Sequence, residues 1–128
     1  MESEFANVNW IAVIVGTVAA FLVGWLWYSP KLFGKGWAEG SGVELGSAQS
    51  MPVFAMVSQL VALFLMSIVI GITAGFEHLM TAIIAILAAA GFVMSAGAFV
   101  KKSNYALGVD FGYIVVAGIV MIICQGIF

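Results

Sequence analysis

The chain has 128 residues, of which 64% are hydrophobic and only 8% are charged, and its mean hydropathy is +1.20. A water-soluble domain carries about a quarter of its residues as charges, so this chain has too few to cover a surface in water. Its four lysines and arginines are also too few for the basic patch that nucleic-acid binding requires. We therefore expect a single domain that is solvated by lipid.

Four long apolar segments divide the chain, at about residues 8–28, 52–74, 77–100 and 105–127. Each is long enough to cross a hydrocarbon core of roughly 30 Å, which takes about 20 helical residues. The apolar runs are continuous and do not alternate with polar residues, which excludes a porin-like barrel. The sequence thus predicts an all-α integral membrane bundle of four transmembrane helices, with residues 1–128 forming one transmembrane domain.

Aromatic and cationic residues gather at the two ends of the first segment. Such side chains anchor helices at a membrane interface, where the surroundings are half apolar and half wet. We expect this anchoring role for Trp10, Trp25, Trp27, Tyr28, Trp37, Lys31 and Lys35. Ser29-Pro30 ends the first helix, since the residue before a proline is pushed out of the α region. The stretch from Lys31 to Glu39 would then lie along the interface as a short amphipathic helix.

Small residues recur at a spacing of four in three of the segments: Gly16, Ala20 and Gly24; Gly71 and Gly75; Gly108 and Gly112. In lipid, such ridges let helix backbones approach closely and gain dispersion contacts. We expect them to be packing seams, either within one bundle or between copies of the chain. A pore lined by these ridges is the less favoured alternative.

The loop at residues 29–50 joins the first two helices, and Ser50 ahead of Met51-Pro52 predicts an N-cap with proline in the first turn. Cations lie only in this loop, as Lys31 and Lys35, and after the third segment, as Lys101 and Lys102. Cytoplasmic loops carry an excess of Lys and Arg. The pattern therefore predicts that both lysine loops face the cytoplasm and that both termini lie outside it.

Asp110 is the one carboxylate well inside an apolar segment. An acid at the centre of a membrane helix costs on the order of 2.5 to 3.5 kcal/mol, so it should have a partner or water. The candidate partners are Tyr113, Lys101 or Lys102, and Asn9 or Gln59 if their depths match. We take Asp110, Tyr113, Gln59 and Asn9 as the candidate polar site. The alternative is that Asp110 lies at the interface and snorkels to the headgroups.

The sequence shows no catalytic machinery. It contains no recognisable nucleophile and base pair, no Gly-rich phosphate loop and no paired carboxylates at membrane depth. The single histidine, His78, has no second His or Cys at the spacing of zinc ligands. We expect neither enzymatic activity, nor a metal, nor a cofactor.

The chain contains Asn9-Trp10, then GWLWYSP and LFGKGW, and then a closing GVDFGYIVVAGIVM. In this order the stretches resemble those of a family of small bacterial integral membrane proteins, domain of unknown function 1761. The resemblance covers nearly the whole chain and is most specific in the first helix and the aromatic loop after it. It implies a four-helix protein of the bacterial inner membrane. It implies no activity that could be carried over to particular residues.

Two functions fit these observations. The first is a structural or accessory membrane protein that acts through helix-helix assembly, with membrane lipids and copies of itself as its partners. The alternative is a homo-oligomeric small transporter or channel, in which Asp110, Tyr113 and Gln59 line a polar route.

Overall fold

The computed structural model describes residues 5–43 and 53–128, and every regular element within these ranges is a helix. The helices are α2 (Trp10–Trp27), α3 (Gly34–Ser41), α4 (Val53–Gly75), α5 (Leu79–Phe99) and α6 (Asn104–Ile127). All except α3 are long and apolar enough to cross a membrane. The prediction of an all-α bundle with four spanning helices is confirmed.

Local capping determines where the helices begin. The Asn9 side chain accepts a hydrogen bond from the Ala12 N–H at 3.1 Å, so α2 starts at Trp10. The α5 helix starts at Leu79, two residues later than predicted, because Glu77 adopts left-handed backbone with a φ of 58° and His78 is the N-cap. The cap predicted at Ser50 lies outside the described residues.

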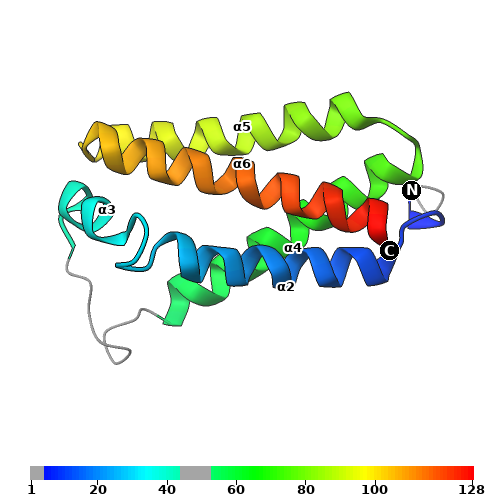
Figure 1. Ribbon diagram of the computed structural model, residues 1–128. Coiled ribbons are helices and arrows are strands. Elements are labelled where there is room, and N and C mark those ends of the chain that lie inside the picture. The colour runs from blue at the N-terminus through cyan, green and yellow to red at the C-terminus, as the bar shows by residue number, and fades with distance from the viewer. Residues whose placement is uncertain (1–4, 44–52) are drawn as a thin grey trace.

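The α6 helix is the centre of the bundle, since it contacts α2, α3, α4 and α5. Its buried face includes Tyr113, Ala117 and Met121. Figure 1 shows α2 running antiparallel to α6, with both termini and the α4–α5 turn at one end of the bundle. The other end holds α3 and the α5–α6 connection, and with them Lys31, Lys35, Lys101 and Lys102, so we call it the lysine end.

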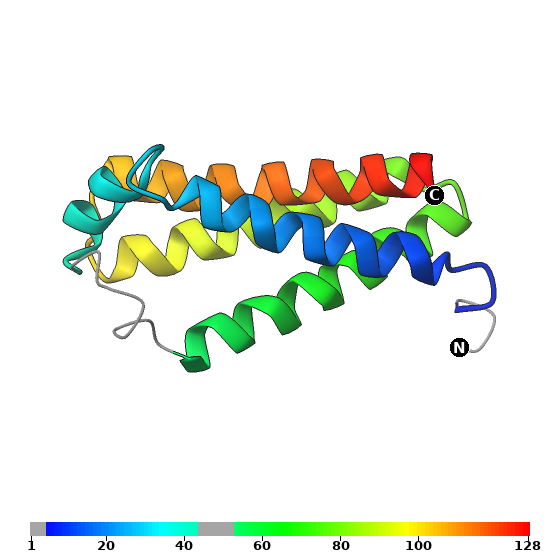
Figure 2. The same ribbon diagram turned by 60° about the horizontal axis from the view of Figure 1, so that its bottom comes forward.

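The α4 helix leans away from the bundle toward its own start, at the lysine end (Figure 2). Its second half packs inside the bundle, where Ser67, Ile70 and Gly71 are buried. At its start, by contrast, Val53 and Phe54 are 75% and 85% exposed. The two halves of α4 therefore have different surroundings, since the second packs against the bundle and the described residues leave the first largely uncovered.

The small-residue ridge on α2 is a packing seam within the chain. An added Cβ would lie 3.2 Å from the Ser67 Oγ at Gly16 and 2.8 Å from the Tyr113 Oη at Gly24. Ala20, between them, is fully buried, and its carbonyl accepts a hydrogen bond from the Tyr113 hydroxyl at 2.8 Å. This ridge thus lets α4 and α6 approach the α2 backbone closely.

The glycines of the other two ridges differ in how closely the rest of the chain approaches them. An added Cβ would contact Val13 at Gly71, Asn7 at Gly75 and Trp27 at Gly112. At Gly108 it would have no neighbour within 4 Å among the residues that the structure describes. Most of the small residues therefore serve the single bundle, and their number is weaker support for contacts between copies than the sequence suggested.

Candidate functional site

Asp110, in the second turn of α6, is buried with 6% of its surface exposed. Tyr28 Oη and Trp37 Nε1 donate hydrogen bonds to its Oδ1 at 2.6 and 2.9 Å, and Lys102 Nζ donates to its Oδ2 at 2.9 Å. All three partners are donors, as an ionised carboxylate requires. We call these four residues the Asp110 cluster. The alternative in which Asp110 reaches out to the headgroups is wrong, because its carboxylate points into this cluster.

Lys102 supplies the positive charge of the cluster. It forms an ion pair with Asp110, and its side chain is 22% exposed while that of Asp110 is 8% exposed. Its Nζ also lies 5.3 Å from the centre of the Trp37 ring, within range of a cation–π interaction. The acid is therefore neutralised where it is buried, which reduces the cost of placing it inside the bundle.

Aromatic rings enclose the carboxylate. The Tyr28 ring meets Trp37 edge-on at 5.1 Å between centroids and Tyr113 at 5.5 Å. Burial and the hydrogen bond to Asp110 raise the pKa of the Tyr28 hydroxyl above its ordinary value. This hydroxyl therefore keeps its proton and acts as a donor at every physiological pH.

A second contact joins the end of α2 to α6. The Trp27 Nε1 donates a hydrogen bond to the Val109 carbonyl at 2.9 Å, and its ring lies 4.7 Å from that of Phe33. Gly112 leaves room for the indole, since an added Cβ there would lie 3.1 Å from Trp27 Cζ2. The last residue of α2 is thus bound to the backbone next to Asp110.

A tight turn after α2 carries Trp37 back to α6. Phe33 N donates to the Trp27 carbonyl at 3.2 Å, and Gly34 N donates to the Ser29 carbonyl at 2.9 Å. Gly34 is required by this turn, because an added Cβ would lie 2.7 Å from the backbone carbon of Ser29. The α3 helix that follows is fixed at its far end by a hydrogen bond from Ser103 N to the Gly40 carbonyl at 2.9 Å.

The structure brings together only part of the predicted polar site. Tyr113 lies beside the Asp110 cluster, but its hydroxyl donates a hydrogen bond to the Ala20 carbonyl, and Gln59 lies near that hydroxyl and not at Asp110. Asn9 caps α2 at the opposite end of the bundle, so it does not belong to the Asp110 cluster. Of the proposed partners of Asp110, Lys102 is the one that binds it.

Sequence reasoning missed the roles of Tyr28 and Trp37 as ligands of Asp110. Both were predicted to be interface anchors, together with Trp27, but the polar atoms of all three bond to groups within the chain. The signal was present in the sequence, as aromatic donors and a single carboxylate that lie at the same end of the bundle. Trp10, Trp25, Lys31 and Lys35 are exposed, and their anchoring role stays a prediction.

We expect Trp37→Phe to lower the free energy of unfolding by about 1.5 to 3 kcal/mol, because it removes a hydrogen bond to a charged group and keeps most of the ring. The matched control is Trp25→Phe, since Trp25 lies in the last turn of α2, at the same end of the bundle, and is 58% exposed. That change should stay within about 0.5 kcal/mol. Equal losses in the two variants, measured by unfolding in a mild detergent, would refute the assignment of Trp37.

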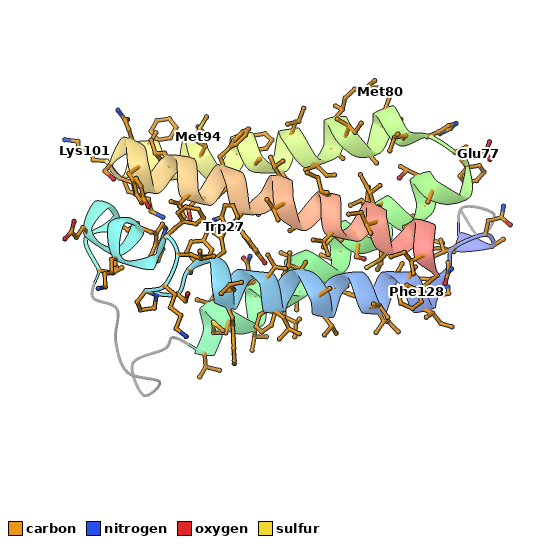
Figure 3. All side chains as sticks on the ribbon, in the orientation of Figure 1. Trp27, Glu77, Met80, Met94, Lys101 and Phe128 are labelled. Atoms are coloured by element: carbon orange, nitrogen blue, oxygen red, sulfur yellow. The ribbon has the colours of Figure 1, made fainter. Side chains whose placement is uncertain are left out.

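The geometry favours a role in holding elements together. Both oxygens of Asp110 are engaged, and the donors come from α3, from the end of α2 and from the α5–α6 connection. One carboxylate thus joins three parts of the lysine end to α6. Figure 3 shows how side chains from these elements crowd together near the labelled Trp27.

A model of the family described as "Protein of unknown function (DUF1761)" matches residues 11–126. This range includes all of the Asp110 cluster and nearly all of the spanning helices. Comparisons with curated proteins and with solved structures give no match. The chain is a small multi-pass membrane protein that belongs to the family described as "Protein of unknown function (DUF1761)".

Proposed function

We propose that the protein is a structural or accessory component of the bacterial inner membrane, which acts through contacts of its helices and not through catalysis. The observation that supports this role is that both carboxylate oxygens of Asp110 accept hydrogen bonds from donors of the same chain. An acid that carries an ion or proton has to exchange its partners during transport. Here the partners also hold α3 in place, so exchange would disturb the fold.

The proposed orientation places the lysine end in the cytoplasm and both termini outside. It is supported by the four lysines, which all lie at one end of the bundle, and by the cytoplasmic excess of cations in membrane proteins. A reporter enzyme that is active only outside the cytoplasm, fused after Phe128, should be active. Activity of a reporter that works only in the cytoplasm, fused at the same position, would show that the orientation is the opposite of the one proposed.

Flux through reconstituted vesicles tests the proposed role against transport. We expect vesicles that contain the wild-type protein to pass protons and potassium no faster than empty vesicles. The alternative, a homo-oligomeric transporter or channel with a polar route near Asp110, is favoured by one observation, the 22% exposure of the Lys102 side chain, which gives water access to the ion pair. Flux that Asp110→Asn abolishes in an intact assembly would support that alternative and defeat our proposal.

Assembly with copies of itself is part of the proposal. Gly108 supports it, because this small residue near the start of α6 is exposed and an added side chain would meet nothing within 4 Å among the described residues. Gly108→Leu should then reduce the subunit number seen by native mass spectrometry and leave the unfolding temperature nearly unchanged.

Gly16→Leu is the matched comparison, since Gly16 packs against Ser67 and Met121 within the chain. We expect that variant to destabilise the bundle by about 1 to 3 kcal/mol through overpacking. An unchanged subunit number in Gly108→Leu would remove this face from the proposed assembly.

A further inference from the structure

A groove opens between α2 and α4 on the side of the bundle. It has a volume of about 340 Å³ and is lined by Ile14, Thr17, Val18, Leu60, Val61 and Phe64. Thr17 is the one polar residue among them, and its hydroxyl donates to the Val13 carbonyl of its own helix at 2.8 Å. The groove therefore offers no free polar group and suits a wholly apolar occupant.

The groove lies at the depth of the hydrocarbon core. With a rise of about 1.5 Å per helical residue, Val18 is roughly 14 Å and Ile14 roughly 20 Å from the end of α2 at the lysine end. Half the thickness of the core is about 15 Å. An acyl chain that enters from the leaflet at the lysine end would thus reach the groove with its distal part.

The divergence of α4 gives such a chain a path. The α2 and α4 helices are in close contact at Gly16 and Ser67, and Thr17, Val18 and Phe64 of the groove lie within one turn of this contact, toward the lysine end. From there the helices move apart toward the start of α4 (Figure 2). Along this path the surface of α4 is apolar and open, with Val57 54% and Val61 50% exposed.

The charges at the lysine end, where this path opens, favour an anionic headgroup. Lys31 and Lys35 are exposed and follow α2 directly, at the end where α4 starts. Asp110 is not available to neutralise them, since it pairs with Lys102. Glu39 is the exposed acid of the same segment, so cations remain in excess among the described residues at this end.

We propose that the groove between α2 and α4 binds one anionic phospholipid, whose acyl chain lies in the groove and whose phosphate lies near Lys31 and Lys35. The lipid fills the space between the diverging helices. It thereby completes the packing of the first half of α4, which the described residues leave largely uncovered.

The acyl-chain half of the proposal is tested with Val18→Trp, which fills the groove from the α2 side. Protein stripped of lipid in mild detergent is titrated with phosphatidylglycerol and followed by native mass spectrometry. We expect the wild type to retain one lipid and the variant to bind it about tenfold more weakly, as for the loss of a short stretch of buried chain. Leu60→Trp fills the groove from α4 and should have the same effect.

Leu87→Trp is the control for these variants, because Leu87 is a similarly exposed residue on α5, at 48%. It should bind as the wild type does. Wild-type affinity in both groove variants would overturn the proposal. So would a dimer that stays free of lipid when wild type is titrated, since a second copy would then occupy the groove.

The headgroup half is tested by the double change Lys31→Gln with Lys35→Gln. We expect the wild type to prefer phosphatidylglycerol over phosphatidylcholine by roughly tenfold or more, as expected for two lysines near a phosphate. The double variant should lose this preference while it still binds both lipids. Lys101→Gln is the control, since Figure 3 places Lys101 at the α5–α6 corner, far from the start of α4. An equal effect of Lys101→Gln, or no preference in the wild type, would contradict the assigned headgroup position.

Discussion

Asp110→Leu should destabilise the protein by about 3 to 5 kcal/mol, the range for removal of one partner from a buried ion pair. Leucine has a similar size but accepts no hydrogen bond, so Tyr28, Trp37 and Lys102 would all lose their shared partner. Thermal unfolding in mild detergent measures the loss. We also expect the lysine end to become more accessible to protease, since α3 is held to α6 through Trp37.

Glu39→Gln is the control for this result. Glu39 lies on α3 at the same end of the bundle, and it is exposed. Its neutralisation should change the free energy of unfolding by no more than about 0.5 kcal/mol. If Asp110→Leu unfolds at the same temperature as this control, the carboxylate does not hold the lysine end together.

Gly34→Ala should lower the free energy of unfolding by about 2 to 3 kcal/mol. The added Cβ would clash with backbone atoms of Tyr28 and Ser29, which belong to the same turn and cannot move without opening it. The turn between α2 and α3 would have to open. Trp37 would then leave Asp110, so the change should also remove most of the further effect of Trp37→Phe.

Gly91→Ala is the matched control for Gly34→Ala, since an added Cβ at Gly91 has no neighbour within 4 Å among the described residues. Within a helix, alanine is favoured over glycine by up to about 1 kcal/mol. We therefore expect Gly91→Ala to be neutral or slightly stabilising. A Gly34→Ala protein as stable as Gly91→Ala would show that the turn tolerates a side chain.

The four spanning helices were predictable because their signal is local. A run of apolar residues long enough to cross the membrane has to form helix, whatever it packs against. The ends of the helices depend on details that hydropathy does not show. The α5 helix starts two residues later than predicted, because the backbone of Glu77 is left-handed.

The Asp110 cluster was not predictable in full, because its contacts join distant parts of the chain. Tyr28 is 82 residues from Asp110, and Trp37 is 73 residues from it. Hydropathy and charge show where a side chain lies along the membrane normal, but not which way it points around its helix. Tryptophan and tyrosine at the interface therefore suggested anchoring, while in the fold their donors turn inward.

The α3 helix shows a similar limit. It contains Gly34, Gly36 and Gly40 within eight residues, a composition that disfavours helix in isolation. The glycines allow the helix to lie against α6, where added Cβ atoms would meet Tyr105 at Gly36 and Ser103 at Gly40. Tertiary packing thus stabilises a helix that its local sequence only partly favours.

The central claim is that Asp110 holds α3 to α6 through Trp37, and a double-mutant cycle of Asp110→Leu and Trp37→Phe tests it most directly. The free energy of unfolding of the wild type, both single variants and the double variant would be measured in the same detergent. We predict a coupling energy of about 1 to 3 kcal/mol, since the two changes remove one shared charged hydrogen bond. Strictly additive effects, with a coupling energy near zero, would contradict this account.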